Sequence, residues 1–213
     1  ARRLKSEVST LRSRFASASR SAASSERPNL VLISLDTLRA DHLSLYGYPR
    51  PTSPKLDSWV RNHRSVTFRQ VVPPSGWTLP SHFSLFTGLE AFRHPANYYR
   101  MAVDASAYGF LAELLREAGY RTQAFTAGGF VHPIYGLAKG FDSFAYLAST
   151  ELRLQELEMS LARVGSWLDD SREEPFLLFL HTYEIHTPNP ARQPYFDQFS
   201  DLPADWTVDV AND

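Results

Sequence analysis

The stretch Leu30-Val31-Leu32-Ile33-Ser34-Leu35-Asp36 decides the fold expected for this chain of 213 residues. Its almost continuous run of aliphatic side chains is typical of a strand that is covered on both faces, as in a parallel sheet. A carboxylate follows at the carboxyl end of the strand, which is where open α/β sheets bind their ligands. The sequence therefore predicts a central, buried strand at 29–36 that delivers Asp36 to a functional site.

Strands and helices alternate from Pro28 onward. The hydrophobic patterns predict strands at 29–36, 66–72, 120–126 and 175–181, and helices at 54–63, from 80 onward, at 106–118 and at 150–168. This alternation predicts the α/β class, with a mostly parallel central sheet and helices on both of its faces. We expect residues 28–213 to belong to one domain.

Residues 1–27 differ in composition from the rest of the chain. They hold seven Lys or Arg against two Glu, a net charge of +5, whereas the whole chain has a net charge of −1. Leu4, Val8, Leu11 and Phe15 recur at helical spacing, followed by a segment rich in Ser and Ala. The pattern suits a membrane-proximal arm or a targeting remnant, and equally a solvated linker.

The overall composition excludes several classes of protein. Hydrophobic residues make up 43% of the chain, but no run of about 18 apolar residues exists that could cross a membrane. Because there is no cysteine, disulfides and thiolate metal sites are excluded. Basic and aromatic residues show no interleaved pattern, so we expect no nucleic-acid partner.

A second informative stretch, Trp77-Thr78-Leu79-Pro80-Ser81-His82, places a hydroxyl and an imidazole at the start of a short apolar helix. Unpaired N–H groups and the positive end of the helix dipole suit a sulfate or phosphate group there. Thr78 is either a nucleophile or only the N-cap of this helix. His82 lies one helical turn further on, roughly on the same face.

The last predicted strand also ends in a polar cluster. His181 and His186 flank this end, five positions apart. An imidazole at His186 can bind an ester oxygen or protonate a departing alkoxide. Alternatively, the two histidines are metal ligands.

Several of these elements, in this order, resemble the opening of the sulfatase family. The residues that carry the resemblance are Asp36-Thr37, Trp77-Thr78-Leu79-Pro80-Ser81-His82, Gly140-Phe141-Asp142 and His186-Thr187-Pro188. The family belongs to the alkaline phosphatase superfamily of metal-dependent ester hydrolases, whose members are longer than this chain. The resemblance therefore implies the N-terminal part of a sulfatase-like catalytic domain, without the C-terminal strands and the further metal ligands, and with an apolar sheet edge left open.

The resemblance implies that Asp36 binds a divalent metal ion. Sulfatases usually present two adjacent aspartates at this point, whereas this chain has Thr37 in the second position. Oxygen ligands suit Ca²⁺, Mg²⁺ or Mn²⁺, and Zn²⁺ accepts both Asp and His. The identity of the metal stays open.

Thr78 occupies the nucleophile position of the sulfatase signature Cys/Ser-x-Pro-x-Arg, with Pro80 in register and His82 in place of the arginine. Sulfatases oxidise the Cys or Ser to formylglycine, which threonine cannot form. In superfamily relatives that cleave or transfer phosphate esters, the nucleophile is instead a threonine alkoxide held on a metal. The resemblance thus implies that Thr78 attacks and binds the metal, that His82 contacts the transferred oxyanion, and that His186 contacts the ester or its leaving group.

These residues predict a metal-dependent hydrolase of sulfate or phosphate esters, whose substrate is a small molecule or a glycan. Departures from the family pattern at Thr37, His82 and Gly129 motivate a second hypothesis, an inactive sulfatase-like domain that binds an anion or a partner. A phosphoglycerol or phosphoethanolamine transferase is the third. An extracytoplasmic or membrane-associated location is expected from the basic N-terminal segment.

Overall fold

The computed structural model describes residues 27–97, 103–147, 156–170, 174–186 and 195–199. The expected N-terminal segment and much of the C-terminal tail lie outside these residues. The strands are β1 (Leu30–Leu35), β2 (Arg121–Thr126), β3 (Ser143–Tyr146) and β4 (Phe176–Thr182). The helices are α2 (Pro54–Asn62), α3 (Thr78–Thr87), α4 (Leu111–Glu117), α5 (Glu156–Asp170) and α6 (Tyr195–Phe199).

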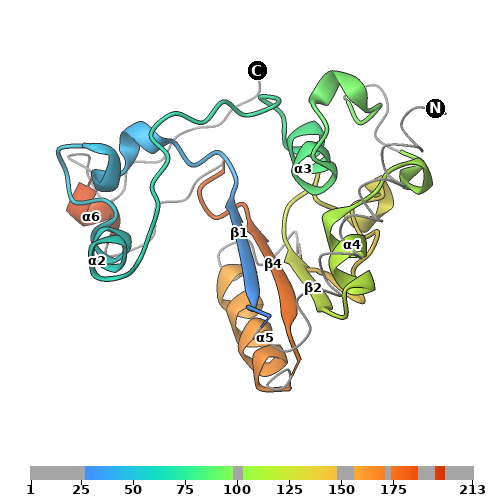
Figure 1. The fold of residues 1–213 in the computed structure, drawn as a ribbon. Helices are drawn as coiled ribbons and strands as arrows, with labels where there is room; N and C mark the ends of the chain where they lie inside the picture. Colours follow the sequence, from blue (N-terminus) through green and yellow to red (C-terminus); the bar gives the residue numbers. More distant parts are fainter. Residues whose placement is uncertain (1–26, 98–102, 148–155, 171–173, 187–194, 200–213) are drawn as a thin grey trace.

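The four strands form one parallel sheet in the order β1-β4-β2-β3 (Figure 1). This sheet and its helices confirm the predicted α/β class. The strands predicted at 120–126 and 175–181 are found as β2 and β4, whereas β3 was not predicted. Its four residues are too few for a hydrophobic pattern to mark them.

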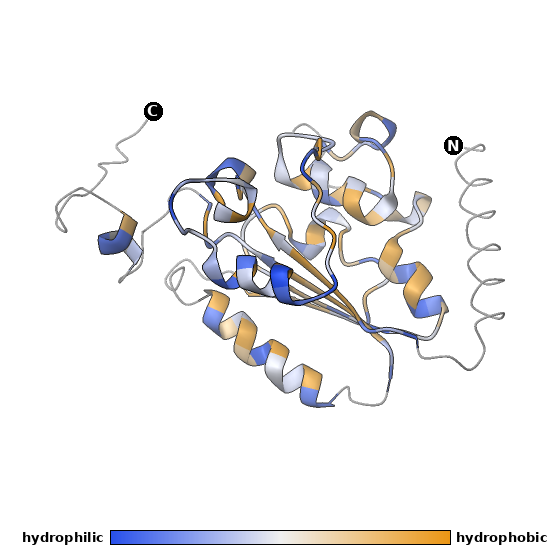
Figure 2. Ribbon diagram, turned by 60° about the vertical axis from the view of Figure 1, so that its left-hand side comes forward, coloured by the Kyte–Doolittle hydropathy of each residue, from blue (hydrophilic) through white to orange (hydrophobic). Residues whose placement is uncertain are grey.

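Two hydrophobic clusters cover the two faces of the sheet. Leu177 and Phe179 of β4 pack with Phe83 and Phe86 of α3 and with residues of α4. Leu178 and Leu180 pack on the other face with α5. Since successive side chains of a strand point to opposite faces, β4 contributes to both clusters and is buried along its whole length. Figure 2 shows how apolar residues are concentrated in the strands and on the inner faces of the helices.

The prediction that the first strand is central and buried is wrong for the described residues. β1 pairs only with β4 there and lies at the edge of the sheet. Val31, Ile33 and Leu35 are 54%, 56% and 44% exposed. The aliphatic run correctly indicated a strand, but the number of its neighbours depends on the rest of the fold. β1 is the open, apolar sheet edge that the resemblance implies.

The strand predicted at 66–72 is not formed. In the structure this segment has no regular secondary structure, and Val66, Phe68 and Val72 are 80%, 68% and 91% exposed. A strand needs a partner to bond its N–H and C=O groups, and none is found beside this segment in the described part of the chain. No helix in that part is both long and apolar enough to cross a membrane.

The other predicted helices are found with shifted ends. The helix predicted at 54–63 is α2, and the one predicted at 106–118 is limited to α4. The described part of the helix predicted at 150–168 is α5, and residues 150–155 lie outside the described residues. The helix predicted from Pro80 begins two residues earlier, at Thr78.

Candidate active site and metal centre

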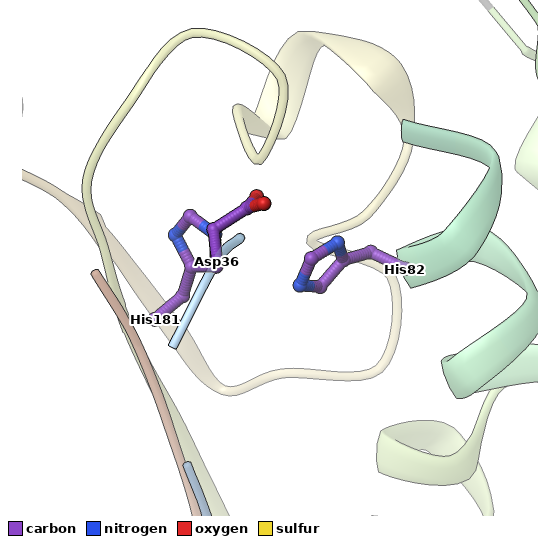
Figure 3. A group of neighbouring side chains, drawn as sticks. All are labelled: Asp36, His82 and His181. Atoms are coloured by element: carbon purple, nitrogen blue, oxygen red, sulfur yellow. The ribbon is translucent and has the colours of Figure 1, made fainter. Parts of the chain in front are cut away.

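The ends of two neighbouring strands bring Asp36 and His181 together. β1 and β4 run in parallel, with Ser34 opposite His181, and the N–H of Asp36 donates to the carbonyl of Thr182. The Nε2 atom of His181 lies 3.3 Å from the Oδ2 atom of Asp36, and the side chain of His181 is fully buried. Figure 3 shows these two side chains next to each other, with His82 directed toward them.

Helix α3 presents Thr78 and His82 to this pair. Both residues are buried, and Thr78 is the first residue of the helix. The helix begins after Trp77, and no side chain caps its N-terminus. The alternative in which Thr78 acts only as the N-cap is therefore not supported. The ring of His82 lies 4.9 Å from the ring of His181, at an interplanar angle of 85°.

Two hydrogen bonds determine how His82 is protonated. Its Nδ1 atom lies 2.8 Å from the carbonyl oxygen of Thr78, which can only accept, so Nδ1 carries the proton. Nε2 of the neutral ring is then an acceptor, and the hydroxyl of Ser34 donates to it over 2.9 Å. His82 thus directs a lone pair toward the strand ends. Ser34, which the sequence analysis did not single out, joins α3 to β1.

The chemistry of the donor atoms fits a divalent metal. The carboxylate of Asp36 and ring nitrogens of His82 and His181 all lie within 4.8 Å of one another. One carboxylate and two imidazoles are typical ligands of Zn²⁺, whereas Ca²⁺ and Mg²⁺ prefer oxygen alone. To bind the metal, the Nε2 atom of His82 would have to give up the hydrogen bond that it accepts from the Ser34 hydroxyl. The sequence analysis placed Asp36 and Thr78 in the metal site and offered His181 and His186 as alternative ligands. The structure brings His181 to Asp36 and adds His82 to the residues that could hold the metal, whereas His186 is not in this group.

The charge of Asp36 is stabilised by its neighbours. Burial by itself raises the pKa of Asp36, but hydrogen bonding with His181 and Thr78 outweighs this effect and holds the pKa below its usual value. Asp36 is therefore ionised at neutral pH, as a metal ligand must be. Because Thr78 takes part in this bonding, its hydroxyl lies beside the carboxylate.

Thr37 joins the two loops that follow the strand ends. Its hydroxyl donates to the carbonyl of Ile185, 3.2 Å away. Its φ of 63° lies in the left-handed region, which costs a β-branched residue about 1–3 kcal/mol. Where sulfatases usually carry a second aspartate, this chain thus has a residue whose hydroxyl bonds the neighbouring loop.

Tyr183 is a further residue of the site that sequence reasoning missed. Its ring lies 5.0 Å from the ring of His181 and 4.5 Å from the ring of His186. Gly128, at φ +85°, makes room for it, because a Cβ atom there would lie 1.7 Å from the Tyr183 ring. The Gly128-Gly129 pair after β2 was the available signal, since glycine marks close approaches of the backbone. Burial, and to a smaller extent the Asp36 carboxylate, raise the pKa of Tyr183 to about 12, so its phenol is neutral.

His186 lies further from the metal cluster than the other candidates. It is half-buried, its ring lies 4.5 Å from the ring of Tyr183 at a tilt of 38°, and it is not in the group formed by Asp36, His82 and His181. The backbone N–H of His186 donates to the carbonyl of Tyr183 in the turn after β4. The structure therefore assembles Asp36, Thr78, His82 and His181 directly and places His186 beside them, across the ring of Tyr183.

We expect the burial of His82 to make the protein less stable in acid. Burial, and the neighbouring His181, lower the pKa of His82 from 6.5 to about 4. Between these values the unfolded chain binds the proton more readily, so the free energy of unfolding falls as the pH falls from about 6.5 to about 4. Each pKa unit corresponds to about 1.4 kcal/mol, so the free energy of unfolding should fall by about 3 kcal/mol over this pH range.

Thermal unfolding of the longest available form of the protein, in chelator, between pH 7 and pH 4 measures this effect. The pH dependence of the stability should be weaker in His82→Gln than in the wild type. It should be unchanged in His63→Gln, because His63 is an exposed histidine that stacks on Trp59. Some dependence remains in both variants because burial also lowers the pKa of His94. An equal acid sensitivity of wild type and His82→Gln would contradict the prediction.

Comparisons with known proteins agree with this fold. An N-acetylgalactosamine-6-O-sulfatase of Bacteroides thetaiotaomicron is 31% identical over 104 residues, which are 46% of this chain and 20% of that protein. The phosphonate monoester hydrolase of Agrobacterium radiobacter shares the fold with a TM-score of 0.70 and 21% identity, over 84% of this chain and 45% of that one.

The C-terminal periplasmic domain of EcEptC from Escherichia coli, solved in complex with Zn, has a TM-score of 0.64 and 20% identity, over 88% of this chain and 53% of that domain. This chain thus spans about half the length of the two solved structures. The Sulfatase family model matches residues 28–207. The chain therefore belongs to the sulfatase family.

Proposed function

We propose that this chain carries the nucleophile and part of the metal site of a hydrolase that cleaves sulfate or phosphate esters. The observation that carries the proposal is the position of Thr78. Its hydroxyl lies beside the ionised Asp36, at the N-terminus of α3, between two strand ends that supply a carboxylate and an imidazole. Family membership supports the reaction class, and the site supports Thr78 as the attacking group.

In this proposal Asp36, His181 and His82 would hold the metal. The donor set favours Zn²⁺ over Ca²⁺. When bound, a divalent cation supplies positive charge that favours loss of the Thr78 proton and stabilises charge on the ester oxygens. A neutral hydroxyl is otherwise a poor nucleophile.

Thr78 then attacks sulfur or phosphorus, and the alkoxide of the substrate leaves with a proton. Backbone N–H groups at the start of α3 are available to the ester oxygens. His82 suits the role of acceptor or ligand better than that of anion donor, because its only N–H is bonded to the Thr78 carbonyl. His186 remains the proposed contact for the leaving group.

The choice between sulfate and phosphate is tested with paired aryl sulfate, phosphate monoester and phosphodiester substrates, with and without chelator. We expect turnover that the chelator abolishes and that added Zn²⁺ or Mn²⁺ restores. Turnover that requires an added alcohol as acceptor would identify a transferase instead. Absence of turnover in a folded, metal-loaded protein would favour the anion-binding or partner-binding domain. The periplasmic origin of the EcEptC domain supports an extracytoplasmic location as part of the proposal.

A further inference from the structure

The site contains a hydrogen-bond donor to which the proposed function gives no role. The hydroxyl of Tyr183 is buried and has no hydrogen-bond partner in the described part of the chain. It faces the hydroxyl of Thr78 and the backbone of Phe130 without bonding either in good geometry. Buried hydroxyls are usually bonded, so an unbonded one at a reactive centre needs an explanation.

The ring that carries this hydroxyl is fixed in position. On one side it lies against Gly128, where any larger residue would collide with it. It also contacts the ring of His181 in an edge arrangement and the ring of His186 in a tilted one. These contacts leave the ring little freedom to turn away from Thr78. A donor held in place before the reaction needs no reorganisation when charge develops near it.

The other polar groups around Thr78 cannot supply this donor. The only N–H of His82 is bonded to the Thr78 carbonyl, and Asp36, being ionised, can only accept. Ser34 donates to His82. Tyr183, in contrast, brings to Thr78 a buried hydroxyl that has no hydrogen-bond partner among the described residues.

We propose that Tyr183 is a catalytic residue that donates a hydrogen bond to the Thr78 oxygen whenever this oxygen carries negative charge. The proposal rests on the function proposed above. In the first step the Thr78 oxygen loses its proton and bonds to sulfur or phosphorus, while the bond to the substrate oxygen breaks and the leaving group takes up a proton and departs as the alcohol. In the second step water attacks sulfur or phosphorus, the bond to the Thr78 oxygen breaks, and one proton of the water is transferred to the Thr78 oxygen as sulfate or phosphate is released. Tyr183 keeps its own proton throughout.

The second step depends most on this donor, because Thr78 is then the leaving group. Loss of the donor should therefore slow release of Thr78 from the covalent ester more than its formation. Substrate binding should change little, since the hydrogen bond is made to the enzyme's own oxygen. This combination differs from what a merely structural role of Tyr183 would produce.

The decisive variant is Tyr183→Phe, which keeps the ring against Gly128 and removes only the hydroxyl. In the longest available form of the protein, with metal added, we expect kcat to fall by about 10²-fold. KM should fall with kcat, and kcat/KM should change little, because breakdown of the covalent ester then limits turnover. A covalent ester on Thr78 should accumulate during turnover, detected by intact mass and by mapping of its peptide. Tyr135→Phe, which removes a nearby phenol that stacks on Phe130, should leave kcat unchanged and accumulate no adduct.

Gly128→Ala provides an independent test, because it pushes the ring away and leaves the hydroxyl in the chain. It should lower kcat in the same way, in a protein whose folding is checked by circular dichroism. An unchanged kcat in Tyr183→Phe, without adduct, would overturn the role of Tyr183 and leave the proposed function intact. Turnover that survives Thr78→Ala would overturn the proposed function and this role with it, as would absence of turnover in the wild type.

Discussion

Replacing Thr78 with alanine is expected to abolish ester hydrolysis, with a loss in kcat of at least about 10³-fold. The reason is geometric: Thr78 supplies the hydroxyl beside Asp36 at the start of α3, and the structure assigns it no role as a helix cap. Removing the oxygen leaves the anion-binding N–H groups and the metal ligands in place, so substrate binding should persist.

The measurement is kcat and KM for the preferred aryl ester, with Thr87→Ala as the matched control. Thr87 lies at the other end of the same helix, where its hydroxyl donates to the carbonyl of Phe83. Loss of a comparable hydroxyl there should leave kcat unchanged. The conservative Thr78→Ser should retain measurable turnover. Full activity in a folded Thr78→Ala protein would mean that another group attacks the ester.

Replacing Asp36 with asparagine is expected to weaken Zn²⁺ binding by at least about 100-fold and to remove turnover at limiting metal. Asparagine keeps the size of the side chain and an oxygen acceptor but removes the charge. The two imidazoles then remain as the only other ligands in the group formed by the described residues. Excess metal should restore part of the activity, which separates loss of affinity from loss of fold.

Titration of Zn²⁺ against a competing chelator measures this effect. Asp41→Asn is the control, because Asp41 follows five residues later but lies exposed in an ion pair with Arg39. We expect wild-type affinity in this control. If Asp36→Asn binds Zn²⁺ as tightly as the wild type, the metal site lies elsewhere in the protein.

The sequence by itself determined the class of fold and the family, and it singled out most of the candidate residues of the site. These conclusions depend on local patterns: apolar runs mark β1 and β4, and a short motif at a helix start marks Thr78 and His82. Patterns of this kind act within a few residues, so a single sequence suffices to detect them. The same locality explains why the segment 66–72 was predicted as a strand: its pattern is that of a strand, but the neighbour that a strand requires is not encoded nearby.

Only the tertiary structure decided how the groups act together. It placed β1 at the sheet edge, brought His181 from β4 to Asp36 across 145 positions of sequence, and fixed the proton of His82 on Nδ1. It also placed Tyr183 against Gly128, beside Thr78. Strand pairing and close packing create these contacts between residues that are remote in sequence, and such contacts determine metal ligation, protonation and the direction of each donor.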